Sequence, residues 1–361
     1  MTSDHLLTRY LSYNRMINEL SGRRLLSIKN TSNGEQAYTI HRLLQQKILL
    51  DMEDFAFADA FRKAFRLIRK RFPVANSQQV PNPQSWDTCQ EYIPHVFTLR
   101  RIYDEHGPST SLVELAPIDL ARLFYEAGFY VWARQTTAYD GLSFLETAER
   151  IINHIQLDEN DKLRADILVI KCVLLLNMGC VERAKGIILI ERAWQIRRNI
   201  FEKHPEHDND VLLQNAISEY SLFLMNEHRF EDAGKLIRER RDRYLVWGPE
   251  SENPFENSKY YGNYSTVLMW RGEMAEALKF QERAIELTER YSGKKALYYR
   301  RAFTLANIRL QSGDLQGALD KHLEVLTARL ELYGKYQEHT IMSTYAVGAM
   351  YHHLGDLDTA T

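Results

Sequence analysis

Apolar residues recur at the three- and four-residue spacing of amphipathic helices along most of this chain. In the last two thirds, the pattern becomes a repeating unit of helix, tight turn and helix, and its clearest copy is AFTLANIRLQSGDLQGA at residues 302–318. There the turn residue Gly313 precedes the small residue Ala318 by five positions, and matching turns at Gly272 and Gly355 lie 41 and 42 residues away. A period of this length predicts helical hairpins stacked into a solenoid.

Six places in the sequence fit this turn step, with turn positions 41 to 49 residues apart: Thr136, Gly179, His228, Gly272, Gly313 and Gly355. Close packing of paired helices calls for a small side chain seven residues before the turn, and five of the six copies have one: Cys172, Ser221, Ser265, Ala306 and Gly348. Four residues before the turn, five copies carry a large apolar side chain, whereas the fifth carries Arg309. In the second copy, Gly186 is an alternative small position after the turn.

The second helices share a further signature, a Glu followed by a central Ala, in FLETAERII, LIERAWQIRR and FQERAIELTER. Together these positions resemble the tetratricopeptide repeat (TPR), and the longer period is similar to that of its kinesin-light-chain variety. The resemblance covers residues 117–361. It implies a mainly α fold, a right-handed α-solenoid of six TPR-like hairpins with an incomplete last repeat, and therefore a frayed C-terminus or a chain that continues.

The N-terminal region follows a different order. Apolar spacing predicts a helix over residues 4–20, and two β-prone runs, LLSIK and AYTIH, flank a polar stretch whose Asn33-Gly34 pair suits a hairpin turn. Helical spacing then returns in HRLLQQKILLDM. Helix, hairpin and helix together predict a small winged-helix-like α+β segment.

The string IHRLLQ, Ile40–Gln45, and this order of elements resemble the winged-helix segment that follows the nucleotide-binding module in fungal NACHT and NB-ARC (STAND) proteins, where TPR repeats come next. The resemblance implies an upstream nucleotide-binding module as a partner of this chain. The chain itself has no GxxxxGK[ST] motif, so it offers no backbone cradle for nucleotide phosphates.

A further amphipathic helix at residues 54–72 carries basic side chains on one face and ends at Pro73. A nucleic-acid or membrane helix is one interpretation. Asp54 and Asp59 dilute the positive charge at its start, which favours the other, the solvated face of a packed helix.

A polar, proline-bearing stretch, PVANSQQVPNPQS, divides the chain and predicts a linker at residues 73–85. We therefore expect a winged-helix-like segment with its following helix at 1–72, a connecting helical segment at 86–116, and the repeat array at 117–361.

Composition narrows the function classes. A formal net charge of −2, from 46 basic and 48 acidic residues, gives no overall field that attracts nucleic acid or an anionic membrane. No apolar run reaches the roughly 20 residues that span a bilayer, and the N-terminus lacks a signal-peptide pattern. The three cysteines suit a reducing compartment. These features predict a cytoplasmic protein with no membrane partner and disfavour nucleic acid.

No motif for catalysis or metal binding stands out. HExxH, GxSxG and CxxC are absent, and the adjacent residues His352 and His353 point about 100° apart on a helix. The KHPEHD cluster suits a polar loop. The sequence predicts no enzyme activity, no metal and no cofactor.

The first helix of each hairpin lines the concave side of such a solenoid, where a peptide or partner helix binds. Repeat register gives the candidate partner-binding residues, to which Arg309 is added because its position is apolar elsewhere: Lys259, Asn263, Thr266, Trp270, Arg300, Thr304, Asn307, Arg309, Tyr345 and His352. Asn263 matches an asparagine that kinesin-light-chain-like repeats use to bind a peptide backbone. Lys259 and Arg300 predict an acidic or carboxylate-bearing ligand, and ordinary solvated helix positions are the alternative interpretation.

These observations favour a non-catalytic scaffold that binds a protein or peptide in the concave groove, as the partner-sensing C-terminal part of a NACHT or NB-ARC-like switch protein. The alternative is a DNA-binding transcriptional regulator with a winged helix and a TPR sensor. For that alternative, HRLLQQK offers only Arg42 and Lys47 as basic contacts.

Overall fold

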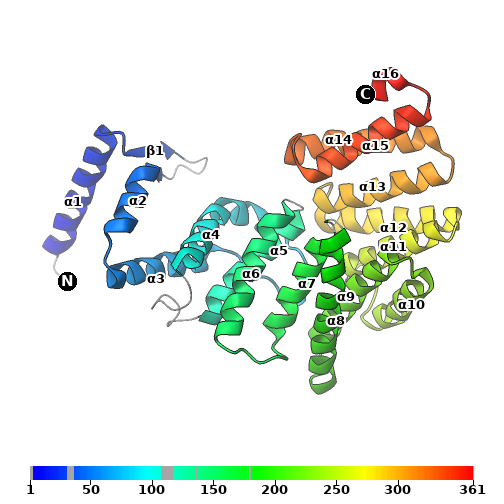
Figure 1. Ribbon diagram of the computed structural model, residues 1–361, viewed down its shortest axis with the longest axis horizontal. Coiled ribbons are helices and arrows are strands. Elements are labelled where there is room, and N and C mark those ends of the chain that lie inside the picture. Colours follow the sequence, from blue (N-terminus) through cyan, green and yellow to red (C-terminus); the bar gives the residue numbers. More distant parts are fainter. Residues whose placement is uncertain are drawn as a thin grey trace. The chain divides into compact units, whose positions relative to one another are not determined.

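The computed structural model describes residues 3–30, 36–106, 117–134, 137–176, 178 and 180–360 (Figure 1). The chain divides into two compact units, one mainly from Met1–Ala64 and the other from Phe65–Ser109 and Val113–Thr361. The boundary falls inside one helix, α3 (Asp54–Arg71).

The N-terminal unit has the predicted order of helix, hairpin and helix. Its elements are α1 (Ser3–Gly22), β1 (Leu26–Asn30), β2 (Gln36–Ile40) and α2 (Arg42–Asp51). The two strands pair antiparallel, with Leu26 opposite Ile40. His41 caps α2, because its Nδ1 accepts a hydrogen bond from the backbone N–H of Leu43 at 3.3 Å. The predicted turn at Asn33 and Gly34 lies outside the described residues.

Helix α3 buries Phe57, Ala58 and Phe61 on its apolar face. Some of its basic residues pair with acidic side chains: Lys63 pairs with Asp59 at 2.6 Å, and Arg69 forms an ion pair with the buried carboxylate of Glu126. The contact of Arg69 supports the packed-helix interpretation for the C-terminal end of α3.

Six helical hairpins follow one another along the repeat array, each formed by a first and a second helix that pack together. They are α5 (Pro117–Arg134) with α6 (Ala138–His154), α7 (Lys162–Leu176) with α8 (Cys180–Lys203), α9 (His207–Asn226) with α10 (Phe230–Val246), α11 (Pro254–Trp270) with α12 (Met274–Ser292), α13 (Ala296–Gln311) with α14 (Leu315–Tyr333), and α15 (Glu338–His353) with the short α16 (Leu357–Ala360). Figure 1 shows these hairpins in chain order from cyan-green to red. This order confirms the predicted fold class.

The first helices of successive hairpins also contact one another, α5 with α7, α7 with α9, α9 with α11 and α11 with α13. We call these five helices the inner layer. Helix α13 in addition contacts α5, so that the fifth hairpin meets the first. The inner layer therefore brings together side chains from helices that are far apart in sequence.

Turn glycines end the first helices where the sequence predicts them. Gly272, Gly313 and Gly355 have φ of +81°, +87° and +82°, a left-handed conformation that favours glycine. His228 takes the same role in the third hairpin with φ of +59°. The predicted turn positions Thr136 and Gly179 lie outside the described residues.

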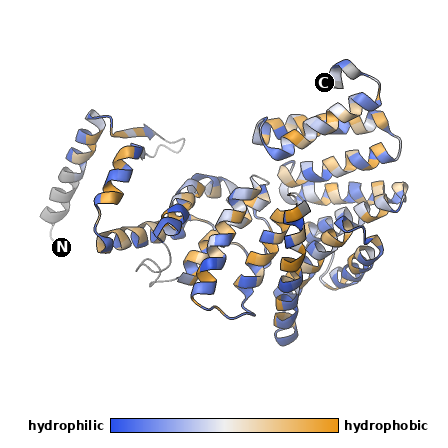
Figure 2. Cartoon of the chain, in the orientation of Figure 1, coloured by the Kyte–Doolittle hydropathy of each residue, from blue (hydrophilic) through white to orange (hydrophobic). Residues whose placement is uncertain are grey.

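Small side chains make the close packing between hairpins possible. Ala233, Ala277 and Ala318, each five residues after a turn, are fully buried. In the second hairpin, Ala184 is exposed, and the buried small residue is Gly186. Hydrophobic and hydrophilic residues alternate along the later helices, as amphipathic packing requires (Figure 2).

Helix α4 (Trp86–His106) precedes the array, and a 3₁₀ turn at Pro83–Ser85 leads into it. Among the helices of the described residues, none is both long and apolar enough to cross a membrane.

Candidate functional site

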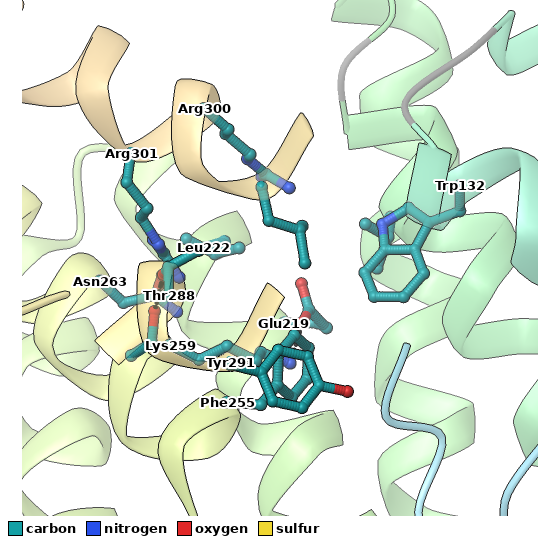
Figure 3. Close-up of a pocket in the computed structure, with 13 residues that line it drawn as sticks. Trp132, Glu219, Leu222, Phe255, Lys259, Asn263, Thr288, Tyr291, Arg300 and Arg301 are labelled. Atoms are coloured by element: carbon teal, nitrogen blue, oxygen red, sulfur yellow. Dashed lines mark hydrogen bonds and ion pairs between the residues drawn. The ribbon is translucent and has the colours of Figure 1, made fainter. Parts of the chain in front are cut away.

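An inner cavity lies in the inner layer, where α13 approaches α5. Its empty volume is about 560 Å³, part of which is open to solvent. Side chains from α5, α7, α9, α11, α12 and α13 line it: Trp132, Val173, Glu219, Leu222, Phe255, Ser258, Lys259, Asn263, Thr288, Tyr291, Leu297, Arg300 and Arg301. Figure 3 shows Trp132 on the opposite side of the cavity from Arg301.

Helical spacing explains which side chains reach the inner cavity. Phe255, Lys259 and Asn263 follow one another at intervals of four, so they lie on one face of α11. On α13, Leu297 lies three and four residues before Arg300 and Arg301. The cavity therefore receives one apolar and several polar groups from each of these helices.

Lys259 is already satisfied within the protein. Its Nζ donates to Glu219 Oε1 at 2.7 Å and to Asn215 Oδ1 at 3.2 Å, and both carboxylate and ammonium are largely buried. Burial alone would raise the pKa of Glu219, but the attraction of Lys259 outweighs it and holds the pKa below its usual value. Glu219 and Lys259 thus form a buried ion pair between α9 and α11.

Asn263 is also engaged. Its Nδ2 donates to Ser218 Oγ at 3.0 Å, and its side chain is buried between α9 and α11. The amide therefore links two helices of the inner layer, and Asn263 is also part of the lining of the inner cavity.

Arg300 and Arg301 differ from these two. Among the described residues, neither guanidinium has a hydrogen bond within 3.5 Å or an ion pair within 4.0 Å. Burial lowers the pKa of Arg300, although Glu219 attracts it. Burial and the repulsion of Arg300 lower the pKa of Arg301 to about 9, which still leaves it protonated at neutral pH.

Gly262 makes room for Arg301. A Cβ at this position of α11 would lie 2.1 Å from Arg301 Nη1 and 2.5 Å from its Cζ. The guanidinium therefore lies directly against the backbone of α11. A side chain at position 262 would occupy the same space and displace it.

Residues 73–85, the predicted linker, lie against the array. Ser77 O accepts a hydrogen bond from Lys162 of α7 at 3.0 Å, and Gln78 O accepts one from Asn215 of α9 at 3.4 Å. Pro81 O accepts another from the hydroxyl of Tyr291 on α12. Burial raises the pKa of Tyr291, so this hydroxyl stays protonated and donates. Tyr291 also lines the inner cavity, which this segment therefore borders.

Gln79 anchors the segment. Its backbone has φ of +57°, and its buried side-chain amide donates to the hydroxyl of Tyr125 at 2.6 Å. Its carbonyl oxygen accepts from Arg197, which also pairs with Asp166 at 3.2 Å. This network joins the segment to α5, α7 and α8.

Of the sequence-predicted contact residues, Lys259, Asn263 and Arg300 line the inner cavity. The other seven are not among its lining residues: Thr266, Trp270, Thr304, Asn307, Arg309, Tyr345 and His352. Trp270 is half-exposed and stacks on Phe230 at 5.6 Å, and Tyr345 and His352 are exposed on α15. Thr266 and Thr304 donate to backbone carbonyls of their own helices.

Arg309 has a contact that explains its departure from the apolar pattern. Its Nη1 donates to Gly317 O at 3.3 Å, and Asp314 lies 4.0 Å from its Nε. Arg309 thus links the end of α13 to the start of α14.

The repeat register did not identify three of the cavity's lining residues, Glu219, Arg301 and Trp132, as contact residues. Arg301 follows Arg300 directly, so the doubled arginine was a signal that could have found it. Trp132 and Glu219 reach the cavity from α5 and α9, and only the contact between α5 and α13 brings Trp132 to it.

The arrangement suits binding. Within the described part of the chain, no group of three or more His, Cys, Asp or Glu side chains could hold a metal ion. The inner cavity offers hydrogen-bond donors, two uncommitted guanidinium groups and an aromatic wall.

Comparison of the sequence with protein-family models finds no match, and neither does comparison with curated proteins. Comparison with solved structures does. The crystal structure of NprR in complex with its cognate peptide NprX matches with a TM-score of 0.57 at 12% identity, over 88% of this chain and 78% of that chain.

Two further similar structures are the apo form of the quorum sensor NprR from B. thuringiensis and BtubC (BKLC) from P. vanneervenii. The first has a TM-score of 0.47 at 11% identity over 88% of each chain, and the second has 0.43 at 18% identity over 60% of this chain and 82% of that chain. At such identities, the similarity to the NprR complex concerns the fold: this chain is a TPR-like array of consecutive helical hairpins.

Proposed function

We propose that the inner layer binds an extended segment of a partner protein or a peptide, and that binding, not turnover, is the work of this chain. One observation carries the proposal. Residues 73–85 already lie along the repeat array as a polypeptide, and side chains of α7 and α9 in the inner layer and of the neighbouring α12 donate to their backbone carbonyls. Such contacts recognise a chain through its main-chain groups, whatever its side chains.

The inner cavity extends this surface. It borders Pro81 through Tyr291 and reaches α13, so a ligand there would continue along the same helices. Lys259, Asn263 and Arg300 are proposed contacts within it, and the other seven predicted residues are proposed contacts of a ligand that extends beyond it.

The similarity to the NprR complex adds support, because NprR is bound there to its cognate peptide. NprX is the cognate peptide of NprR. At 12% identity, the comparison shows that this chain shares the fold of NprR, and it does not identify the ligand of this chain.

For the larger context, we propose that the array senses a partner for a NACHT or NB-ARC-like switch. The helix, hairpin and helix of residues 3–51 support this context by their order. Supplied together with such a nucleotide-binding module, the chain should lower its ATP turnover, and an unchanged rate would contradict this context.

A cavity-filling substitution tests the binding function. Peptides selected from a random display library on the full chain should lose binding to the Leu297→Trp variant, because the larger ring fills the inner cavity. Leu330→Trp, at an exposed position of α14, is the matched control. Selection of no peptide, or equal binding by both variants and the unaltered chain, would contradict the proposal.

A further inference from the structure

We propose that Arg300 and Arg301 form a carboxylate-binding subsite of the inner cavity, which takes an acidic group of a bound peptide. This inference rests on the proposed peptide-binding function and adds the chemical class of the ligand. The sequence predicts Lys259 and Arg300 as the cationic contacts. In the structure Lys259 is paired with Glu219, and Arg301 takes its place beside Arg300.

Charge inside the cavity is unbalanced. Lys259, Arg300 and Arg301 contribute three positive charges and Glu219 one negative charge, which leaves a net charge of +2 on its lining. Glu219 is committed to Lys259 at 2.7 Å. The two guanidinium groups of α13 are therefore the cations without a hydrogen-bonded partner in the described lining of this cavity.

Leaving two adjacent cations without partners is unfavourable for the folded protein. Both side chains are partly buried, which penalises their charge, and Arg300 repels Arg301. A carboxylate from a ligand removes both penalties, because a guanidinium donates two parallel hydrogen bonds to it. Binding of a carboxylate at this site is therefore electrostatically favourable.

Gly262 of α11 provides the space that the guanidinium of Arg301 needs. Gly262 has no side chain, and the guanidinium of Arg301 occupies the space that a Cβ would take. Because the obstructing atoms are the far end of a flexible side chain, a methyl group at this position would displace the guanidinium with little change to the helices.

The apolar part of the lining indicates what kind of molecule carries the carboxylate. Trp132, Leu222 and Phe255 present apolar surface to the same cavity. An acidic group that adjoins an apolar or aromatic side chain matches both the guanidinium groups and this apolar surface. In a peptide, the carboxylate comes from Glu or Asp, or from the C-terminus.

Three libraries of short peptides test the subsite on the full chain. The first contains one Glu in N-acetylated, C-amidated peptides, the second replaces that Glu with Gln, and the third is the Gln library with a free C-terminus. The binders from each library are measured by fluorescence anisotropy. We expect the Glu library or the free C-terminus library to bind roughly tenfold or more tightly than the Gln library, since a hydrogen bond to a charged group exceeds a neutral one.

The expected preference is lost in Arg300→Gln and in Arg301→Gln and is kept in Arg290→Gln, an exposed arginine of α12 that serves as the matched control. Arg301→Gln should unfold at the same or a higher temperature than the unaltered chain, because it removes one of two partly buried like charges that are neighbours on α13. A purely structural arginine would lower the unfolding temperature instead.

Gly262→Ala provides a second variant that keeps both arginines. It should abolish the preference for the carboxylate, because the methyl group displaces the guanidinium of Arg301. A preference retained in both Gly262→Ala and Arg301→Gln would overturn the inference.

Failure of this inference differs from failure of the proposed function. If all three libraries bind equally and Leu297→Trp still abolishes their binding, the cavity binds peptides and the carboxylate subsite is wrong. If no library binds to the full chain, both are wrong.

Discussion

Charged side chains inside the inner layer are satisfied to different degrees. The buried carboxylate of Glu219 and the ammonium of Lys259 pair directly, so neither is available to a ligand without breaking an ion pair. Arg300 and Arg301 have no such partner among the described residues. The difference separates residues that hold the helices together from residues that are free to bind.

Buried histidine gives the array a pH-dependent stability. His322 of α14 is buried against Phe303 at a ring distance of 5.0 Å, and burial, with repulsion from Arg329, lowers its pKa from 6.5 to about 4. The folded protein keeps it neutral down to about pH 4, whereas the unfolded chain takes up a proton below about pH 6.5. The free energy of unfolding should therefore fall as the pH is lowered from 6.5 towards 4.

Thermal denaturation across this pH range checks the expectation. His322→Gln should reduce the loss of stability on acidification, although His339, whose pKa burial also lowers to about 4, keeps part of it. His353→Gln, at an exposed position, is the control and should leave the slope unchanged. Identical slopes for all three proteins would contradict this role of His322.

Repeat register predicted part of the candidate site. It identified Lys259, Asn263 and Arg300 because the helical period alone decides which residues of a first helix face inward. It could not show that Lys259 is paired, since Glu219 lies 40 residues away on another helix. Whether a cation is committed depends on tertiary contacts, which one helix's sequence does not contain.

At the scale of elements, the hairpins were predictable because each is specified locally. Apolar spacing recurs in every unit, and turn glycines and small packing residues recur in most of them, so Gly272, Gly313 and Gly355 end the helices where the pattern places them. The second hairpin departs from the repeat pattern because its buried small residue is Gly186, two positions after the predicted Ala184. A Cβ there would lie 2.6 Å from Phe223 Cζ, so the close approach is real even though the spacing has changed.

The position of residues 73–85 was not predictable from their composition. Polar residues and prolines are typical of a linker, and the same residues serve equally well to donate and accept hydrogen bonds on a polar surface. The partners of Gln79, Tyr125 and Arg197, come from two different hairpins. Only the folded array brings them together.

Gln79 should be the residue that holds this segment in place. Gln79→Ala removes the buried amide that bonds Tyr125 and Arg197 and leaves an alanine at φ of +57°. We expect a loss of about 2 kcal/mol or more in the free energy of unfolding, because the buried hydroxyl of Tyr125 and guanidinium of Arg197 lose a hydrogen-bond partner. The same substitution should make residues 73–85 more susceptible to proteolysis.

Gln84→Ala is the matched control for that experiment, because Gln84 is exposed and its side chain makes no contact in the described network. Urea denaturation and limited proteolysis measure the two effects. If Gln79→Ala matched the control in both, the segment would not be held by this residue.

At the scale of the whole molecule, the contact between α13 and α5 is decisive. It brings the fifth hairpin to the first, so that Trp132 and Arg301, which lie on different hairpins, line one cavity. The segment that carries Pro81 runs to the same place. We therefore assign ligand binding to the inner layer, and not to the N-terminal unit or to the second helices of the hairpins.

Site-specific photocrosslinking tests this claim most directly. The full chain is prepared with p-benzoylphenylalanine at Trp132 in the inner cavity, at the exposed Leu43 of α2, or at the exposed Ile188 of α8, and each is irradiated with the peptides selected on the unaltered chain. We expect a crosslinked peptide from position 132 and none from positions 43 and 188. Crosslinks from position 43 or 188 with none from position 132 would contradict it.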